Sequence, residues 1–240
     1  MNKRNYQREL DKLLEGFERE GIVPNLFLHS CCAPCSSYCL EYLSDHFEIT
    51  VFYYNPNIFP DTEYEDRVNE QERLIRELNE AGVKHPIRLV KGEFRPEVFY
   101  EAVKGLEKEP EGGARCTECF KLRLEESAKL AKEGNYDYFT TTLTISPLKD
   151  AERLNRIGEE MGEKYGVKFL NSDFKKKNGY KRSTELSKEH DLYRQNYCGC
   201  VYSKRVADDD GGIDDQRHTD GDDGHAQRFF IQCHAVVAHP

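Results

Sequence analysis

Hydrophobic positions along the chain change their spacing several times, and each change predicts a different element. The segment 6–20 is amphipathic at the helical period, with one apolar face formed by Leu10, Leu13, Leu14 and Phe17. Beyond it, short apolar runs predict strands at 25–29, 47–54, 87–90, 136–144 and 167–169. Amphipathic segments between these runs predict helices at 36–43, 62–82, 96–105, 118–134 and 148–166. Because strands alternate with helices, the chain is predicted to be an α/β protein with one parallel sheet and helices on both faces.

The same pattern predicts how the chain is divided. Residues 1–24 form an N-terminal helix, and residues 25–206 form a single α/β domain that we expect to carry the catalytic site. From residue 207 to residue 240 the sequence is acidic and rich in glycine and has no hydrophobic periodicity, so we expect this tail to be disordered. Its histidines and Cys233 are interpreted as adventitious rather than as metal ligands.

The charge and composition of the chain indicate which kinds of binding partner it can have and in which cellular compartment it is expected. The 240 residues include 44 acidic and 35 basic side chains, which gives a formal net charge of −9. This balance argues against a partner recognised through a strongly basic surface, although it leaves room for a local basic groove. No apolar stretch approaches the roughly 18 residues that a membrane helix needs, and the N-terminal segment lacks the apolar core of a signal peptide. We therefore expect a cytoplasmic protein without a membrane partner.

Nine cysteines are the most informative feature of the sequence. Structural disulfides are rare in a reducing compartment, so the grouping of the cysteines has to reflect metal binding, redox chemistry or burial. Cys39 lies in a predicted helix and is interpreted as a small buried hydrophobic residue. Seven others form three groups along the chain, namely Cys31, Cys32 and Cys35; Cys116 and Cys119; and Cys198 and Cys200.

The position of the first group predicts a metal centre. Residues 31–35 follow a predicted strand and precede a helix, where α/β folds place ligand-binding loops and where helix N-termini favour anions such as thiolates. Cys116 and Cys119 have the CxxC spacing, which serves either metal binding or thiol–disulfide exchange. Together with Cys31 and Cys32 they supply four thiolates, the number that a 4Fe-4S cluster needs, with zinc as the competing metal.

The third group, Cys198-Gly199-Cys200, leaves two chemistries open. A glycine between two cysteines permits an unusual, tight backbone turn. The two thiols could form a redox-active dithiol that delivers two electrons, or they could bind a second metal together with Cys35. The sequence pattern does not choose between them.

Several separated motifs resemble the QueH family of epoxyqueuosine reductases. They are LHSCCAPC at 28–35, YNPNI at 54–58, RCTEC at 115–119, TTTL at 140–143 followed by Ser146-Pro147, and YRQNYCGCV at 193–201. The resemblance covers about residues 26–203 and implies a Rossmann-like fold of the HUP type. It also implies an iron–sulfur enzyme that reduces epoxyqueuosine to queuosine at the wobble position of tRNA, the last step of queuosine biosynthesis. The partners would then be a tRNA carrying epoxyqueuosine and an electron donor that the sequence does not identify.

The resemblance further implies roles for the cysteines. The ligands of the 4Fe-4S cluster would be Cys31, Cys32, Cys116 and Cys119. Cys198 and Cys200 would act as a catalytic redox pair or, together with Cys35, as ligands of an adjacent mononuclear iron. Deoxygenating an epoxide takes two electrons, whereas a 4Fe-4S cluster normally transfers one, so a second redox element is expected. We favour the iron, which as a Lewis acid would bind the departing oxygen.

A local basic segment predicts where the tRNA binds. An isolated lysine run is usually a solvated loop, but this one lies close in sequence to the CxC motif, and the enzyme has to hold phosphates while a wobble base enters the site. The candidate tRNA-binding residues are Lys175, Lys176, Lys177, Lys181, Arg182 and Arg194. The candidates for stacking on bases are Tyr54, Tyr193 and Tyr197.

Three other functions compete with this one. A zinc-stabilised nucleic-acid-binding module would need no catalysis. A tRNA-thiolating relative of the same fold would need a pyrophosphate loop rich in glycine and serine after its first strand, where this chain has the cysteine-rich segment 30–35. A simple dithiol oxidoreductase would leave at least four of the cysteines unexplained.

Overall fold

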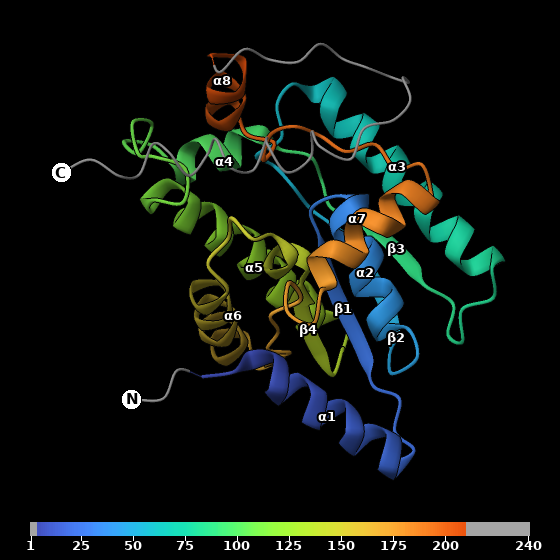
Figure 1. Ribbon diagram of the computed structural model, residues 1–240. Helices are drawn as coiled ribbons and strands as arrows, with labels where there is room; N and C mark the ends of the chain where they lie inside the picture. The colour runs from blue at the N-terminus through green and yellow to red at the C-terminus, as the bar shows by residue number, and fades with distance from the viewer. Residues whose placement is uncertain (1–3, 210–240) are drawn as a thin grey trace.

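The computed structural model describes residues 4–209 and has a five-stranded, all-parallel sheet at its centre. The strand order is β3-β2-β1-β4-β5 (Figure 1). The strands are β1 (Asn25–Ser30), β2 (Glu48–Tyr53), β3 (Arg88–Lys91), β4 (Tyr138–Thr141) and β5 (Lys168–Phe169). This confirms the predicted Rossmann-like α/β class, and it brings the carboxyl ends of β1, β2 and β4 to one edge of the sheet.

Helices cover both faces of the sheet, as predicted. One face packs against α1 (Tyr6–Glu20), α2 (Ala33–Leu43), α3 (Asp61–Glu80) and α7 (Gly179–Glu189). The other packs against α5 (Ala114–Glu133) and α6 (Ala151–Tyr165). The short helix α4 (Pro96–Ala102) and the last helix, α8 (Val201–Asp209), lie near one another at the top of Figure 1. Within residues 4–209, no helix combines the length and the apolar character that crossing a bilayer requires.

The first helix shows why its sequence folds as predicted. The Asn5 side chain accepts a hydrogen bond from the backbone N–H of Arg8 at the N-terminus of α1, and Gly21 ends the helix in the left-handed conformation. Leu10 and Leu14 are buried in the same core cluster as Leu26 and Leu28 of β1. The helix predicted at 1–24 is therefore packed on the α/β domain.

Several boundaries differ from the predicted ones, and the differences matter for the site. Helix α2 begins at Ala33 instead of residue 36, and α5 begins at Ala114 instead of residue 118. The predicted strand 136–144 ends at Thr141 and continues as the 3-10 helix η1 (Thr142–Ile145). Cys35 and Cys116 therefore lie in the first turn of a helix, or close to it, and Cys116 does not lie in a loop before α5.

The region after β5 is more ordered than the sequence pattern indicated. The basic segment is a turn over residues 174–178, and Gly179 then begins α7, a helix that was not predicted and that packs on α2. A Cβ at Gly179 would lie 1.9 Å from the backbone oxygen of Phe174 and 2.5 Å from the Tyr38 ring, so only glycine allows this close approach. Helix α8 was also not predicted, and it extends three residues into the segment 207–240. The remainder of the predicted disordered tail, with Cys233 and the histidines, lies outside the described residues.

Candidate metal centre

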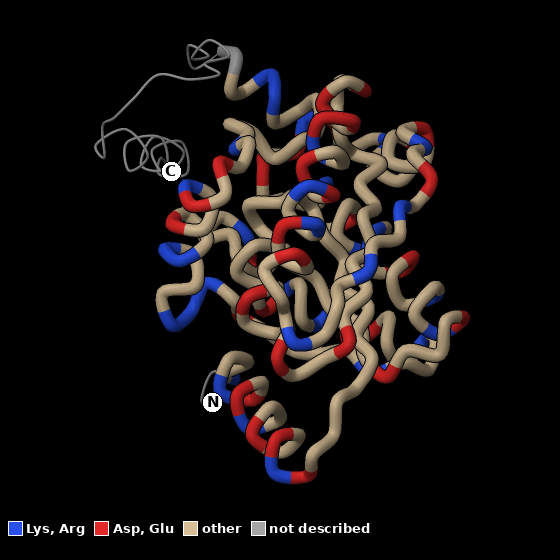
Figure 2. Tube along the Cα trace, turned by 90° about the vertical axis from the view of Figure 1, so that its right-hand side faces the viewer, with Lys and Arg blue, Asp and Glu red and all other residues tan. Residues whose placement is uncertain are grey.

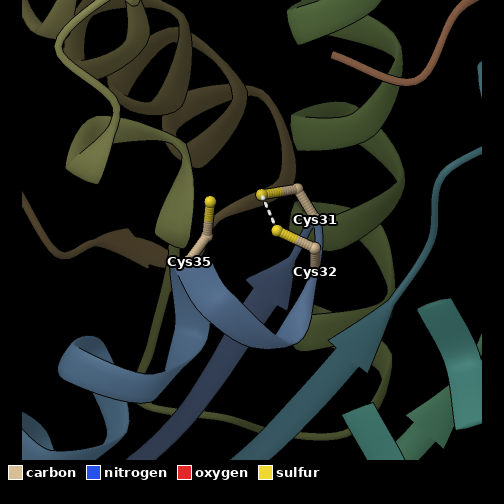
Figure 3. A group of neighbouring side chains, drawn as sticks. All are labelled: Cys31, Cys32 and Cys35. Carbon is tan, nitrogen blue, oxygen red and sulfur yellow. Dashed lines mark hydrogen bonds between the residues drawn. The ribbon is translucent and has the colours of Figure 1, made fainter. Parts of the chain in front are cut away.

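Three cysteines converge at the carboxyl end of β1. Cys31 follows the strand directly, Cys32 is the N-cap residue of α2, and Cys35 lies in the first turn of that helix. Their sulfur atoms all lie within 4.8 Å of one another, and the Cys31 and Cys32 sulfurs are 3.9 Å apart (Figure 3). Cys31 and Cys35 are half-buried, whereas Cys32 is only 1% exposed. This group is able to hold a metal ion.

The local backbone explains why the sulfurs point together. Pro34 occupies a first-turn position of α2, where its missing N–H costs nothing, and Cys32 has the extended backbone typical of an N-cap. No side chain caps the helix at Cys32, so the amides of the first turn are free to favour negative charge close by. Hydrogen bonds from Cys31 and Cys35 hold the pKa of Cys32 well below its usual range. The pKa of Cys35 is raised instead, mainly by its hydrogen bond with Cys31 and then by its hydrogen bond with Cys32.

The other two cysteine groups meet beside α5. Cys119 and Cys200 are buried in one cluster with Phe99 and Val103. Burial raises the pKa of Cys119 to about 12, and the charges of Cys198 and Cys200 add to this effect. In the described part of the chain, Cys116, Cys119, Cys198 and Cys200 do not belong to the compact group formed by Cys31, Cys32 and Cys35.

Two features hold these groups in place. The backbone N–H of Gly112 donates a hydrogen bond to the Cys116 sulfur at 3.2 Å. Gly199 adopts a φ of +123°, and its carbonyl oxygen accepts a hydrogen bond from the backbone N–H of Phe59 at 2.8 Å. The glycine of the CxC motif therefore has the left-handed backbone that the sequence predicted for a tight turn.

Buried cations surround the cysteines, and sequence reasoning missed them. Arg67 and Arg123 are each 2% exposed, and Lys149 is half-buried. Although burial opposes its charge, the pKa of Lys149 is raised by the thiols of Cys198, Cys31 and Cys35. Glu63 and Cys32 raise the pKa of Arg67 in the same way, against its burial. No sequence signal marks a charged residue as buried, because its burial depends on elements far apart along the chain.

Polar atoms beside the first cysteine group lack partners among the described residues. The buried Tyr53 hydroxyl, Arg67 Nη2 and Gln71 Nε2 have no hydrogen bond there. Gln71 lies next to the cysteine loop, because its Oε1 accepts hydrogen bonds from the hydroxyls of Ser30 and Ser36 at 2.6 and 2.8 Å. Tyr53 is the register partner of Ser30 on the neighbouring strand.

The donor set and its surroundings fit an anionic, thiolate-bound metal group. Unsatisfied buried donors cost free energy unless an acceptor meets them, and buried cations need compensating negative charge. Thiolates are the ligands that select zinc, copper(I) and iron–sulfur clusters. The residues present therefore suit an iron–sulfur group, and they also suit zinc.

The predicted tRNA-binding residues lie close together, but most of them carry partners. Lys175 pairs with Asp173 at 2.7 Å and Lys177 with Asp11 at 2.6 Å. The remaining pairs join Lys181 to Glu185, Arg182 to Glu41, Glu185 and Glu189, and Arg194 to the Ser187 hydroxyl. Lys176 is exposed and has no ion pair within residues 4–209. Acidic and basic positions alternate over the face of the molecule in Figure 2.

The candidate stacking tyrosines differ in exposure. Tyr54 is buried and stacks on Phe52, with ring centroids 5.5 Å apart. Tyr193 is 40% exposed, and its hydroxyl donates to Glu63. Tyr197 donates to the carbonyl oxygen of Phe59 and lies beneath the cations of Arg67 and Lys204. Tyr193 and Tyr197 are thus better placed than Tyr54 to meet a base.

A parallel sheet with three converging cysteines at its carboxyl edge defines an α/β protein with a candidate metal-binding centre. Residues 26–206 match the model of the family "Epoxyqueuosine reductase QueH", and the chain belongs to this family. It is therefore an oxidoreductase, an epoxyqueuosine reductase, as the sequence motifs indicated. The match extends over the whole region of the predicted resemblance and disfavours a tRNA-thiolating enzyme.

Curated relatives support the family over most of the chain. An epoxyqueuosine reductase QueH from Staphylococcus epidermidis is 45% identical over 204 residues, which cover 83% of this chain and 84% of the relative. One from Streptococcus pyogenes serotype M1 is 43% identical over 202 residues, covering 84% and 79%. One from Thermotoga maritima is 37% identical over 181 residues, covering 74% and 89%.

Proposed function

We propose that this chain reduces the epoxide of epoxyqueuosine in tRNA to give queuosine, with the cysteine groups as its redox centre. Family membership and the converging sulfurs of Cys31, Cys32 and Cys35 carry this proposal. The reaction converts an epoxide to an alkene, and it consumes two electrons and two protons while the oxygen leaves as water.

The cysteines divide into two functional sets in this proposal. Cys31, Cys32, Cys116 and Cys119 hold a 4Fe-4S cluster, which when bound supplies electrons one at a time. Cys35, Cys198 and Cys200 hold an adjacent iron, or Cys198 and Cys200 act as a dithiol. Oxidation of that dithiol to a disulfide releases two electrons and two protons, which equals the requirement of the epoxide.

The turn between Cys198 and Cys200 suits either role. Arg67 Nη1 donates to the Cys198 carbonyl oxygen at 3.4 Å, and Phe59 holds the Gly199 carbonyl oxygen. These bonds fix the backbone on both sides of Gly199, so the thiols are presented by a held turn. The thiols of Cys198, Cys31 and Cys35 raise the pKa of Lys149, which keeps a positive charge close to the cysteines.

The tRNA would approach this edge of the sheet from the side of α7. Lys175, Lys176, Lys177, Lys181, Arg182 and Arg194 are proposed to contact its phosphates, and Tyr193 and Tyr197 to contact bases near the entering nucleoside. Exposed ion pairs such as Lys181 with Glu185 hold the side chain weakly, so a phosphate can replace the carboxylate.

A direct assay tests this function. Anaerobically purified, iron-loaded protein is incubated with tRNA that carries epoxyqueuosine and with a low-potential chemical reductant, and the digested nucleosides are identified by mass spectrometry. We expect queuosine to form with the wild-type chain and not with Cys32→Ser. Absence of queuosine from wild-type protein that retains its iron would contradict the proposal.

A further inference from the structure

Arg123 lies on α5 beside the CxxC pair and is hydrogen-bonded towards the carboxyl edge of the sheet. It follows Cys119 by four residues and Cys116 by seven, so all three side chains are on one face of the helix. Arg123 is 2% exposed and lies deeper in the fold than either cysteine. Its position joins α5 to the carboxyl edge of the sheet.

The hydrogen bonds of Arg123 reach only neutral groups. Its Nε donates to the Cys119 carbonyl oxygen at 3.2 Å, and its Nη1 donates to Asn55 Oδ1 at 3.4 Å. Asn55 Nδ2 in turn donates to the carbonyl oxygen of Ser30 at 2.8 Å, directly before Cys31. The guanidinium is therefore anchored between the CxxC pair and the first cysteine group.

The other two buried arginines have different partners, although Arg67 Nη2 and Arg115 Nε lack a hydrogen bond among the described residues. Arg67 forms an ion pair with Glu63 at 2.6 Å. Arg115 donates to the carbonyl oxygens of Leu106, Glu107 and Glu109. Neither Arg115 nor Arg123 has a carboxylate within ion-pair distance in the described part of the chain, but only Arg123 is hydrogen-bonded to the backbone of a CxxC cysteine. A buried cation without an anion destabilises a fold by several kcal/mol, typically about 3–5 when a partner has been removed, so Arg123 requires negative charge.

The electrostatic interactions of Arg123 are with thiols from all three cysteine groups. Against the opposing effect of burial, Cys119, Cys198, Cys31 and Cys116 raise the pKa of Arg123.

We propose that Arg123 is the built-in counter-charge of the metal centre and raises its reduction potential. This inference rests on the proposed function, because it assumes that the thiols hold an iron–sulfur group. Reduction adds negative charge to such a centre, and a fixed cation in a buried, low-dielectric site stabilises the reduced form more than the oxidised form. Arg123 acts as a positioning and tuning residue and touches neither substrate nor reacting atoms in this role.

The test compares Arg123→Met with Arg123→Lys in the holoenzyme. Methionine removes the charge and keeps an unbranched chain, whereas lysine keeps the charge and loses the guanidinium hydrogen bonds. Iron and sulfide are counted per chain, and the midpoint potential is measured by a redox titration followed by electron paramagnetic resonance. Arg73→Met is the matched control, since Arg73 is a half-buried arginine of α3 that forms ion pairs with Glu70 and Glu77.

Arg123→Met should either lose iron or have a lower midpoint potential. At the wild-type midpoint potential, the ratio of reduced to oxidised centre should then fall at least tenfold, which corresponds to a shift of about 59 mV for a one-electron couple. Arg123→Lys should restore both values toward those of wild type, and Arg73→Met should leave them unchanged. Wild-type iron and potential in Arg123→Met would overturn the proposal. So would a lysine variant as impaired as the methionine variant, since this would show that the hydrogen bonds, not the charge, matter. A wild-type protein without iron would instead refute the proposed function itself.

Discussion

At the scale of single residues, the site is defined by where each sulfur lies relative to a helix start. Cys32 is the N-cap of α2 and is almost fully buried, whereas Cys39 lies one turn beyond Cys35 and donates to its carbonyl oxygen at 3.4 Å. Both cysteines are buried, yet only Cys32 belongs to the group of sulfurs within 4.8 Å. The interpretation of Cys39 as a small hydrophobic residue agrees with its place in the main core cluster.

Cys32→Ser should lose iron and activity together. A four-thiolate cluster has no spare ligand, and serine oxygen is a poor substitute for a soft thiolate. Iron content and queuosine formation are measured on the same anaerobic preparation. Cys39→Ala is the matched control and should keep both, since Cys39 faces the core. Full iron and turnover in Cys32→Ser would remove Cys32 from the ligand set.

Gly199→Ala should lower activity while leaving the protein folded. At a φ of +123° an alanine is strained by about 1–3 kcal/mol, and its Cβ would lie 3.1 Å from Arg67 Nη1 and 3.2 Å from Ile58. The turn that presents Cys198 and Cys200 would shift, with a loss of turnover of roughly tenfold or more.

Gly16→Ala is the control for this substitution. Gly16 lies inside α1, and a Cβ there would meet nothing within 4 Å, so the exchange should stabilise the helix by about 0.5–1 kcal/mol. Turnover and thermal unfolding are measured for both variants. Unchanged turnover of Gly199→Ala would show that the CxC turn has no need of its strained backbone.

At the scale of elements, helix starts place the chemistry. The parallel strands end at one edge, and α2 and α5 begin there, so Cys35 and Cys116 both lie in the first turn of a helix at this edge although 81 positions separate them. Helix α1 contributes no site residue but closes one side of the core through Leu10 and Leu14.

Leu10→Ala should destabilise the whole domain. Leu10 is 1% exposed, and truncating a buried leucine costs about 2–5 kcal/mol of the free energy of unfolding. Denaturant unfolding of the two variants provides the measurement, with Lys12→Ala on the exposed face of the same helix as control; that exchange should change stability by no more than about 0.5 kcal/mol. Equal stability of Leu10→Ala and wild type would mean that α1 is not part of the folding unit.

The elements show how much the sequence could reveal. The spacing of hydrophobic residues, together with turn-forming residues, located the strands and the long helices. Burial of one helical face or of a whole strand requires hydrophobic residues at regular positions in the sequence. The first turns of α2 and α5 carry no such pattern, since their residues serve the site rather than the core, and both helices were predicted to begin too late. Pro34 was an available signal for the start of α2.

The site could be predicted only in part for a related reason. Cysteine spacing identified the thiols, whereas Arg67, Arg123 and Lys149 resemble the many surface cations of a chain with 35 basic residues. Their burial follows from packing between α3, α5, the end of the sheet and the segment around Cys198, which local sequence does not encode.

At the scale of the whole molecule, charge is interspersed rather than segregated, as Figure 2 shows. The tRNA must therefore be held by a few cations near the site and not by a broad basic face. Lys176 and Lys181 are the most suitable, because both are exposed. Lys176 has no ion pair among the described residues, and Lys181 Nζ lies 3.9 Å from Glu185 Oε1, at the limit of an ion pair.

Lys176→Gln together with Lys181→Gln should weaken tRNA binding and make it less salt-dependent. Removing one cation that binds a phosphate lowers the slope of log affinity against log salt by about 0.7–0.9. Affinity is measured at several salt concentrations, with Lys129→Gln plus Lys132→Gln on α5, across the sheet from α7, as the charge-matched control. Equal slopes for the two double variants would leave the basic segment as a solvated surface.

The most direct test of an iron–sulfur centre in this chain is the iron and sulfide content, with the ultraviolet–visible spectrum, of anaerobically purified full-length protein. We predict a brown protein with about four sulfides and more than four irons per chain, as a 4Fe-4S cluster beside a further iron requires. A colourless protein that binds zinc, and that takes up no cluster on reconstitution with iron and sulfide, would contradict this prediction.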